Sequence, residues 1–216
     1  MAPSTRRSSS LVSTPRQERS RATHDALLQS FRRLLRGKSL GDISVAEIAT
    51  AAGTSVGGFY ARFAAKEALL VPLAEEVLSE ARQAMDAAFD APGVASSLSR
   101  VVDAYVGVIV QQFREHRSTL QQIRQAASGE TAAAIARLVH EFNVYAHARF
   151  RTLALEHRAS IKHRSPAQAV ELALFIGSAS AREAILSENW KSYEIRPDDA
   201  LLVAEISRAV RRYLEG

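Results

Sequence analysis

The chain has 216 residues, of which 47% are hydrophobic and 24% charged, so it can bury a core as one large domain or as two unequal domains. It contains no cysteine, which excludes disulfides and thiolate metal sites. The best apolar run, residues 101–110, is too short for a membrane span and contains Asp103, so no membrane partner is expected. Aromatic residues make up only 6% of the chain, and this composition favours helices over sheets.

The positive charge is concentrated in the first third of the chain. The net charge is +5, but residues 1–66 hold 11 Lys/Arg against 4 Asp/Glu, and residues 67–216 hold 17 against 19. Such an asymmetry points to a polyanionic partner for the N-terminal part. A solvated basic tail without any partner remains the alternative.

Residues 1–17 are rich in Ser, Thr, Pro and Arg, and we expect them to form a disordered basic N-terminal arm. They lack the apolar core of a secretory signal. Their composition also fits a mitochondrial transit peptide, but a basic arm on a cytoplasmic DNA-binding protein looks the same. A helix should follow over residues 19–36, where apolar residues recur at spacings of three and four.

Two short helices around a glycine turn are expected next. Ser44 and Glu47 have the spacing of a capping box, which predicts a helix from Ser44 to about residue 52. Gly53 supplies a turn, and Ser55 can cap a second short helix that ends near Tyr60. This arrangement is a helix-turn-helix.

Only helices are expected in the rest of the chain, which makes the fold class all-α. Pro72 lies inside the first of them and predicts a kink or break there. The segment 94–116 is apolar around most of its circumference, which is typical of a helix buried among other helices. The expected helices span residues 66–90, 94–116, 117–127, 130–158, 165–187 and 198–214, with a loop at 188–199.

The stretch 42–70, "DISVAEIATAAGTSVGGFYARFAAKEALL", resembles the DNA-binding signature of the tetracycline-repressor (TetR) family. The shared pattern is a Ser start, Ile-Ala, Ala-Gly, a Ser cap, a Gly, Tyr-x-x-Phe and Lys-Glu. The family often has Lys or Arg near position 56 and Thr near position 58, where this chain has Val56 and Gly58. The resemblance implies an N-terminal three-helix DNA-binding domain at residues 18–65. A larger helical ligand-binding and dimerisation domain would follow at residues 66–216.

Double-stranded DNA is the partner that this resemblance implies for the first domain. Val56 is suited to a thymine methyl group, and Tyr60 is suited to a phosphate, although a core aromatic with an exposed hydroxyl is the plain alternative for Tyr60. For Arg16, Arg19 and Arg21, a minor-groove or phosphate role and a solvated tail are equally open. The expected DNA-binding residues are Ser44, Thr54, Ser55, Val56, Gly57, Gly58, Tyr60, Arg62 and Lys66.

A homodimer through the last two helices is the second implication. Residues 177–181 are all small, which permits close approach of helices, and residues 202–213 carry an apolar stripe. Ordinary packing within the chain is the alternative. Two-fold symmetry also suits the function, because one short helix reads only a few bases.

A small-molecule effector, mostly apolar with one or two polar groups, is the third implication. Tyr105 and Tyr145 are the stronger candidates, because a buried hydroxyl needs a partner that a ligand could supply. Membership of the ordinary core is the alternative for each position. The expected ligand-binding residues are Met85, Phe89, Tyr105, Phe113, Ile123, Phe142, Tyr145 and Phe175.

No cofactor, metal or catalytic residue is expected. His140 and His147 share a helix face, but no zinc-binding motif accompanies them, and no nucleotide-binding or hydrolase motif occurs. The sequence therefore predicts a homodimeric, ligand-responsive regulator of transcription, a repressor that a ligand releases from a palindromic operator. The alternatives are a ligand-independent or non-specific nucleic-acid binder and an all-helical enzyme that uses the C-terminal cavity.

Overall fold

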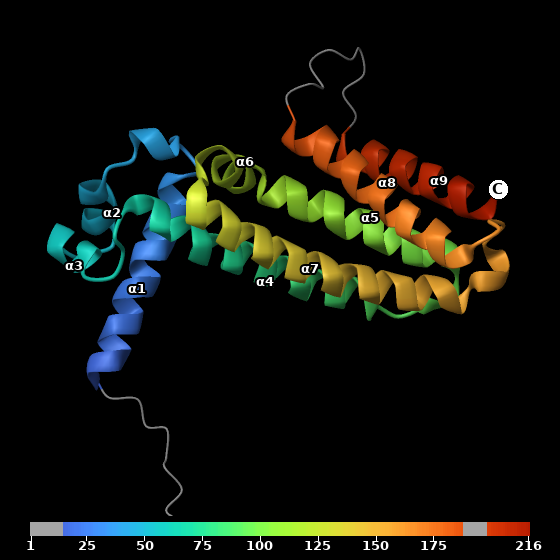
Figure 1. Ribbon diagram of the computed structural model, residues 1–216, viewed down its shortest axis with the longest axis horizontal. Coiled ribbons are helices and arrows are strands. Elements are labelled where there is room, and N and C mark those ends of the chain that lie inside the picture. The colour runs from blue at the N-terminus through green and yellow to red at the C-terminus, as the bar shows by residue number, and fades with distance from the viewer. Residues whose placement is uncertain (1–14, 188–197) are drawn as a thin grey trace, which may run out of the picture. The chain divides into compact units, whose positions relative to one another are not determined.

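The computed structural model describes residues 15–187 and 198–216, and within these ranges every regular element is helical (Figure 1). The chain divides after Lys66 into two compact units. The predicted all-α fold is confirmed. No helix in the described part is long and apolar enough to cross a membrane. Residues 1–14 of the predicted arm and residues 188–197 of the predicted loop lie outside the described residues.

From residue 15 onward, the N-terminal unit contains three α-helices and one 3-10 helix around a small core. These elements are α1 (Pro15–Leu34), η1 (Leu40–Asp42), α2 (Val45–Ala51) and α3 (Val56–Tyr60). Helix α1 starts at Pro15, earlier than the predicted residue 19, because proline is well suited to the first helical position. Phe31, Ile48 and Phe59 are completely buried.

Both short helices begin at the predicted caps. The Ser44 hydroxyl accepts from the Glu47 amide at 3.1 Å, and the Glu47 carboxylate accepts from the Ser44 amide at 2.9 Å. Gly53 turns the chain with a φ of 67°, in the left-handed region that favours glycine. The Ser55 hydroxyl then accepts from the Gly58 amide at 3.0 Å. The predicted helix-turn-helix is confirmed.

The C-terminal unit is a bundle of long helices that lie alongside one another (Figure 1). Helix α5 packs against α4, α7, α8 and α9, which agrees with its nearly all-round apolar surface. Val101, Val102 and Val106 of α5 are completely buried. The α-helices are α4 (Leu70–Phe89), α5 (Leu98–Glu115), α6 (Arg117–Ala126), α7 (Gly129–Glu156), α8 (Pro166–Leu186) and α9 (Asp199–Glu215). In the described part of this unit, three 3-10 helices accompany them: η2 (Lys66–Leu69), η3 (Val94–Ser96) and η4 (Arg158–Ser160).

Two details of the predicted helices are wrong. The expected break at Pro72 does not occur, because Pro72 is the third residue of α4 and lies in its first turn, where a missing N–H costs little. The change of helix type comes earlier, where η2 meets α4. The predicted helix over 94–116 is interrupted at Ser97, which is extended and caps α5 by accepting from the Arg100 amide at 3.3 Å.

Candidate functional site

Helix α3 presents an exposed face made of apolar and small residues. The side chains of Val56 and Tyr60 are 42% and 55% exposed, and a spacing of four residues places them on the same side of the helix. Gly57 lies between them and is exposed, and a Cβ added there would meet only the Ser55 hydroxyl, at 3.8 Å. Because Gly57 has no side chain, the backbone of α3 can approach a partner closely on this face.

Gly58 has a different role from Gly57. A Cβ at Gly58 would collide with the Thr54 hydroxyl, which lies over the first turn of α3. The absence of a side chain at Gly58 therefore makes room for Thr54. Sequence reasoning grouped the two glycines together, and only the position of the Thr54 side chain separates them.

Two predicted DNA-binding hydroxyls cap helices. Ser44 Oγ accepts from the Glu47 amide and also donates to the Glu47 carboxylate at 3.0 Å. Its hydrogen-bonding capacity is therefore largely used within the capping box. Ser55 Oγ accepts from the Gly58 amide, which leaves its O–H free to donate to a partner.

The capping box of α2 has a strong electrostatic component. Lys38 Nζ lies 2.5 Å from Glu47 Oε1. The hydrogen bond from Lys38, followed by those from the Ser44 amide and hydroxyl, lowers the pKa of Glu47 to about 2. Glu47 therefore stays ionised and holds the start of α2 at neutral pH.

The ammonium group of Lys66 is engaged within the protein, so a phosphate contact is not expected. Its ammonium donates to the carbonyl oxygens of Leu40 and Ile43, both at 2.7 Å, and to that of Gly41 at 3.3 Å. An ammonium has three N–H donors, so these three acceptors use its full capacity. The expected role of Lys66 as a DNA-binding residue, through a phosphate, does not fit this geometry, and Lys66 instead closes the segment around η1.

Arg62 and Arg19 come together at one end of α3. Arg62 donates to the Gly58 carbonyl at 2.9 Å and to the Ser20 carbonyl at 3.4 Å, which ties α3 to α1. These two arginines line a surface hollow of about 360 Å³ together with Ser20, Thr23 and Ala61. Sequence reasoning did not join them, because they are more than forty residues apart in the chain.

The C-terminal unit contains a small apolar cavity of about 80 Å³. Met85, Phe113 and Phe142 line it, as the sequence predicts. The other lining residues, which the sequence did not single out, are Val77, Leu78, Ala81, Ile109, Gln112, His116 and Leu120. Within the described residues, no group of three potential metal ligands occurs.

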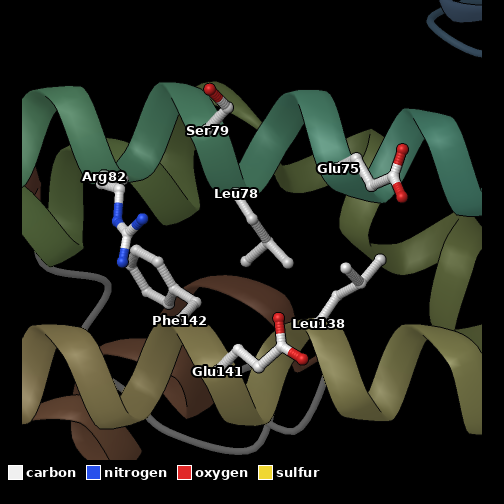
Figure 2. A pocket seen from close by; sticks show the side chains of 7 residues that line it. All are labelled: Glu75, Leu78, Ser79, Arg82, Leu138, Glu141 and Phe142. Atoms are coloured by element: carbon white, nitrogen blue, oxygen red, sulfur yellow. The ribbon is translucent and has the colours of Figure 1, made fainter.

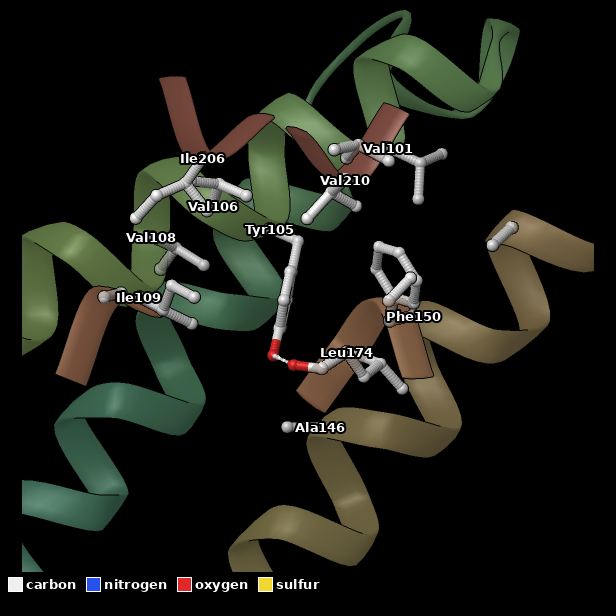
Figure 3. Close-up of a cluster of buried hydrophobic side chains, with 14 of the residues drawn as sticks. Val101, Tyr105, Val106, Val108, Ile109, Ala146, Phe150, Leu174, Ile206 and Val210 are labelled. Atoms are coloured by element: carbon white, nitrogen blue, oxygen red, sulfur yellow. Dashed lines mark hydrogen bonds between the residues drawn. The ribbon is translucent and has the colours of Figure 1, made fainter. Parts of the chain in front are cut away.

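The other five predicted ligand residues, Phe89, Tyr105, Ile123, Tyr145 and Phe175, lie elsewhere in the unit. Phe89 and Ile123 are buried but line none of the described cavities. The Tyr105 hydroxyl donates to the Leu174 carbonyl at 3.3 Å, and its ring lies 4.8 Å from that of Phe150 (Figure 3). Burial raises the pKa of Tyr105 far above its ordinary value. Phe175 is 63% exposed on α8 and lines none of the described cavities.

Tyr145 has partners from the protein itself. Its hydroxyl donates to the Asp86 carboxylate, and this hydrogen bond is the main cause of the raised pKa of Tyr145. The Arg82 guanidinium lies 3.7 Å from the centre of the Tyr145 ring. The argument that these two tyrosines need a ligand as partner therefore fails, because the chain satisfies both hydroxyls.

The row of small residues in α8 serves packing within the chain at two positions. Gly177 faces the Tyr105 ring, which a Cβ would approach to 3.2 Å, and Ala181 is completely buried. The exposed apolar residues of α8 are Leu172 and Phe175, at 46% and 63%. These two side chains, rather than the small residues, form the candidate contact surface.

Comparisons with known proteins agree with this geometry. Residues 27–73 match the family model described as bacterial regulatory proteins, tetR family. A search of curated proteins gives no match.

Several solved structures share the fold. A protein from Rhodococcus sp. assigned to the TetR family of transcriptional regulators has a TM-score of 0.62 at 14% identity, covering 90% of this chain and 99% of its own. The fatty acid degradation regulator FadR from Bacillus halodurans has a TM-score of 0.58 at 17% identity, covering 92% and 96%. RolR in complex with resorcinol has a TM-score of 0.54 at 20% identity, covering 91% and 95%.

The match of residues 27–73 includes the end of α1, all of α2 and α3, both caps and the exposed face of α3 described above. Together with the shared all-helical fold, it identifies a DNA-binding regulator of transcription. Residues 27–73 carry a DNA-binding domain of the kind found in the tetR family of bacterial regulatory proteins.

Proposed function

We propose that this chain is a cytoplasmic repressor that binds a palindromic operator as a homodimer and is released from it by a small, mostly apolar ligand. The exposed face of α3, with Val56 and Tyr60 on either side of Gly57, is the observation that carries the proposal. The N-terminal unit, up to Lys66, would bind DNA, and the C-terminal unit would bind the ligand and the second copy.

Each exposed residue of this face has its own role on DNA. Val56 packs on a thymine methyl group, and the Tyr60 hydroxyl donates to a phosphate. The bare backbone at Gly57 lets α3 enter a major groove about 12 Å wide. Arg19 and Arg62 at the end of α3 supply positive charge for the neighbouring phosphates.

A pair of substitutions separates base reading from backbone contact. Tyr60→Phe should weaken binding to all duplexes by about threefold to tenfold, because one hydrogen bond to the backbone is lost. Val56→Ala should change the preference at one base step and leave the others unchanged. Fluorescence anisotropy over a panel of duplexes measures both effects. A change of base preference in Tyr60→Phe would show that its role is assigned wrongly.

Dimerisation rests on exposed apolar residues of α8 and α9. Leu172, Phe175 and Leu201 are 46%, 63% and 44% exposed, and aromatic and aliphatic residues of this kind anchor interfaces. Replacing Leu172 and Phe175 by Ser should shift sedimentation from dimer to monomer. The matched control is replacement of Val139 and Val144 on α7, which are 39% and 57% exposed, and it should leave the dimer intact.

The ligand response is supported by the apolar cavity and by the relatives. RolR is seen in complex with resorcinol, and FadR is described as a regulator of fatty acid degradation. The ligand acts by stabilising one of two arrangements of the dimer, and it shifts nothing unless it prefers one of them. Helix α4 directly continues the chain from the DNA-binding unit through η2, so a change at its cavity-lining residues is transmitted along one segment.

A non-specific nucleic-acid binder and an all-helical enzyme remain the competing functions. Footprinting on genomic DNA separates the first, because a regulator protects a palindrome and a non-specific binder covers the DNA uniformly. Turnover of a metabolite by the purified protein would support the second.

A further inference from the structure

A groove between α4 and α7 combines an apolar floor with charged edges (Figure 2). Leu78 points into it from α4, and Leu138 and Phe142 line it from α7. Glu75 and Glu141 extend from the two helices beside these apolar side chains. The groove has a volume of about 240 Å³, and a spacing of three or four residues on each helix brings its lining together.

The groove adjoins the apolar cavity of the same unit. Leu78 and Phe142 line both spaces and are only half-buried. The cavity alone, at about 80 Å³, holds little more than two or three water molecules at roughly 30 Å³ each. Movement of these two side chains would join the two spaces and reach the lower end of small-molecule sites, roughly 300 Å³.

Three polar groups that line these two spaces offer acceptors, and the other polar lining residues are Ser79, Arg82 and His116, whose Nε2 lies 3.3 Å from Glu80 Oε2. Glu75 and Glu141 form no hydrogen bond or ion pair within the described part of the chain. On the α5 wall of the cavity, Gln112 Oε1 is buried without a hydrogen-bond partner among those residues. Gln112 Nε2 donates to the Glu115 carboxylate at 3.2 Å, which fixes the amide with its oxygen as the spare acceptor.

Among the described residues that line the groove, Arg82 is the only cation. Arg82 stacks on Tyr145, whose hydroxyl donates to Asp86, and the Asp86 carboxylate is 3.6 Å from Arg149 Nε. Arg82 and Glu75 lie at opposite ends of the groove (Figure 2). An anionic group on a ligand near Glu75 or Glu141 would therefore meet a carboxylate, whereas Arg82 lies at the other end of the groove from Glu75.

We propose that this groove and cavity together bind a lipophilic amine. The carboxylates of Glu75 and Glu141 hold its protonated nitrogen, and its apolar body passes between Leu78 and Phe142 toward Met85 in the cavity. The inference rests on the proposed ligand-responsive function and adds the chemical class of the ligand.

Three probes with one apolar body and different end groups test the charge preference. They are 2-naphthylmethylamine, 2-naphthylmethanol and 2-naphthoate, titrated into the full-length protein by calorimetry. The amine should bind about tenfold more tightly than the alcohol, because two partly exposed carboxylates each contribute modestly, and the carboxylate probe should bind most weakly.

A double substitution, Glu75→Gln with Glu141→Gln, assigns the preference to the groove. It should lower amine affinity about tenfold, to the level of the alcohol, and leave alcohol affinity unchanged. Glu130→Gln with Glu156→Gln makes the same charge change at two exposed positions of α7 that do not line the groove, and amine affinity should stay the same. Met85→Trp should weaken both the amine and the alcohol, because it fills the cavity.

Three results would overturn the inference. The first is no binding of the amine, and the second is equal loss in both double variants. The third is tightest binding by 2-naphthoate that depends on Arg82, which would assign the site to anionic amphiphiles. A separate DNA-binding assay keeps the proposed function distinct. Glu-dependent amine binding that leaves DNA affinity unchanged would support the site and refute ligand-controlled release.

Discussion

The candidate sites of the two units are built from residues that lie at very different distances from one another along the chain. The predicted DNA-binding residues lie between Ser44 and Lys66. Each short helix begins at a serine whose hydroxyl accepts a hydrogen bond from the backbone amide three residues later. The cavity of the C-terminal unit draws side chains from α4, α5, α6 and α7, between Val77 and Phe142. A site built from local contacts can be deduced from its sequence, whereas a site built by helix packing depends on which face each helix turns inward.

The largest expected effects separate the cores of the two units. Phe59→Ala should remove about 3–5 kcal/mol from the unfolding free energy of the N-terminal unit, because Phe59 is completely buried there. Phe150→Ala should do the same in the C-terminal unit, where Phe150 packs on Tyr105. Hydrogen exchange, followed helix by helix, measures which unit loses protection. Equal loss of protection in both units from either variant would show that the two cores are not independent.

The next effect concerns Lys66 and separates a structural cation from a DNA contact. Lys66→Met keeps the apolar stem and should cost about 1–3 kcal/mol of stability, because three carbonyl oxygens lose their donor. The salt dependence of DNA binding by the folded variant should not change. Arg19→Gln, at the hollow beside α3, should instead reduce the salt slope by about one ion. A reduced slope in Lys66→Met would restore Lys66 as a phosphate contact.

The two glycines of α3 predict smaller effects on stability, which differ between the two positions. Gly57→Ala should stabilise the free protein by about 0.5–1 kcal/mol, because the site is open and alanine is the better helix former. It should also weaken DNA binding, because the added methyl group lies on the exposed face. Thermal unfolding and anisotropy measure the two effects.

Gly58→Ala is the matched variant. It should give no stabilisation while Thr54 is present, and it should stabilise once Thr54→Ala has removed the hydroxyl that the new methyl group meets. Equal behaviour of the two glycine variants would show that Thr54 does not distinguish these positions.

The smallest effect is the acid response of the capping box. The pKa of Glu47 is lowered to about 2, so its contribution to stability is present above the ordinary carboxyl pKa of 4.5 and is lost as the pH falls through about 2. Lys38→Met should raise the pKa of Glu47, because the hydrogen bond from Lys38 is the largest cause of the lowering. Carboxyl NMR titration measures the shift. An unchanged pKa would show that Lys38 does not lower the pKa of Glu47.

Much of the fold was predictable from the sequence, because its signals are local. The capping box at Ser44, the cap at Ser55 and the glycine turn appear in the structure where the spacing predicts them. Pro72 misled the prediction because its effect depends on its position in the helix, and only the start of α4 reveals that position. The N-cap at Ser97 was missed because the apolar pattern continues on both sides of it.

The C-terminal site was less predictable, because aromatic spacing does not say which face is inside. Met85, Phe113 and Phe142 line the cavity, whereas Phe175 is on the surface. The Tyr105 hydroxyl finds the Leu174 carbonyl, a partner that no pattern in the sequence indicates. The groove of Glu75 and Glu141 was missed because charged residues on a helix face are usually solvated, and their role depends on α4 and α7 being neighbours.

Selection of bound sequences from a pool of random duplexes tests the central claim most directly. The exposed face of α3 in a homodimer should enrich two inverted half-sites with centres about 10 base pairs, or one helical turn, apart. Footprinting on the selected DNA should then protect that palindrome. A pool without enrichment, or uniform protection of the DNA, would contradict the claim that this face of α3 reads a specific operator.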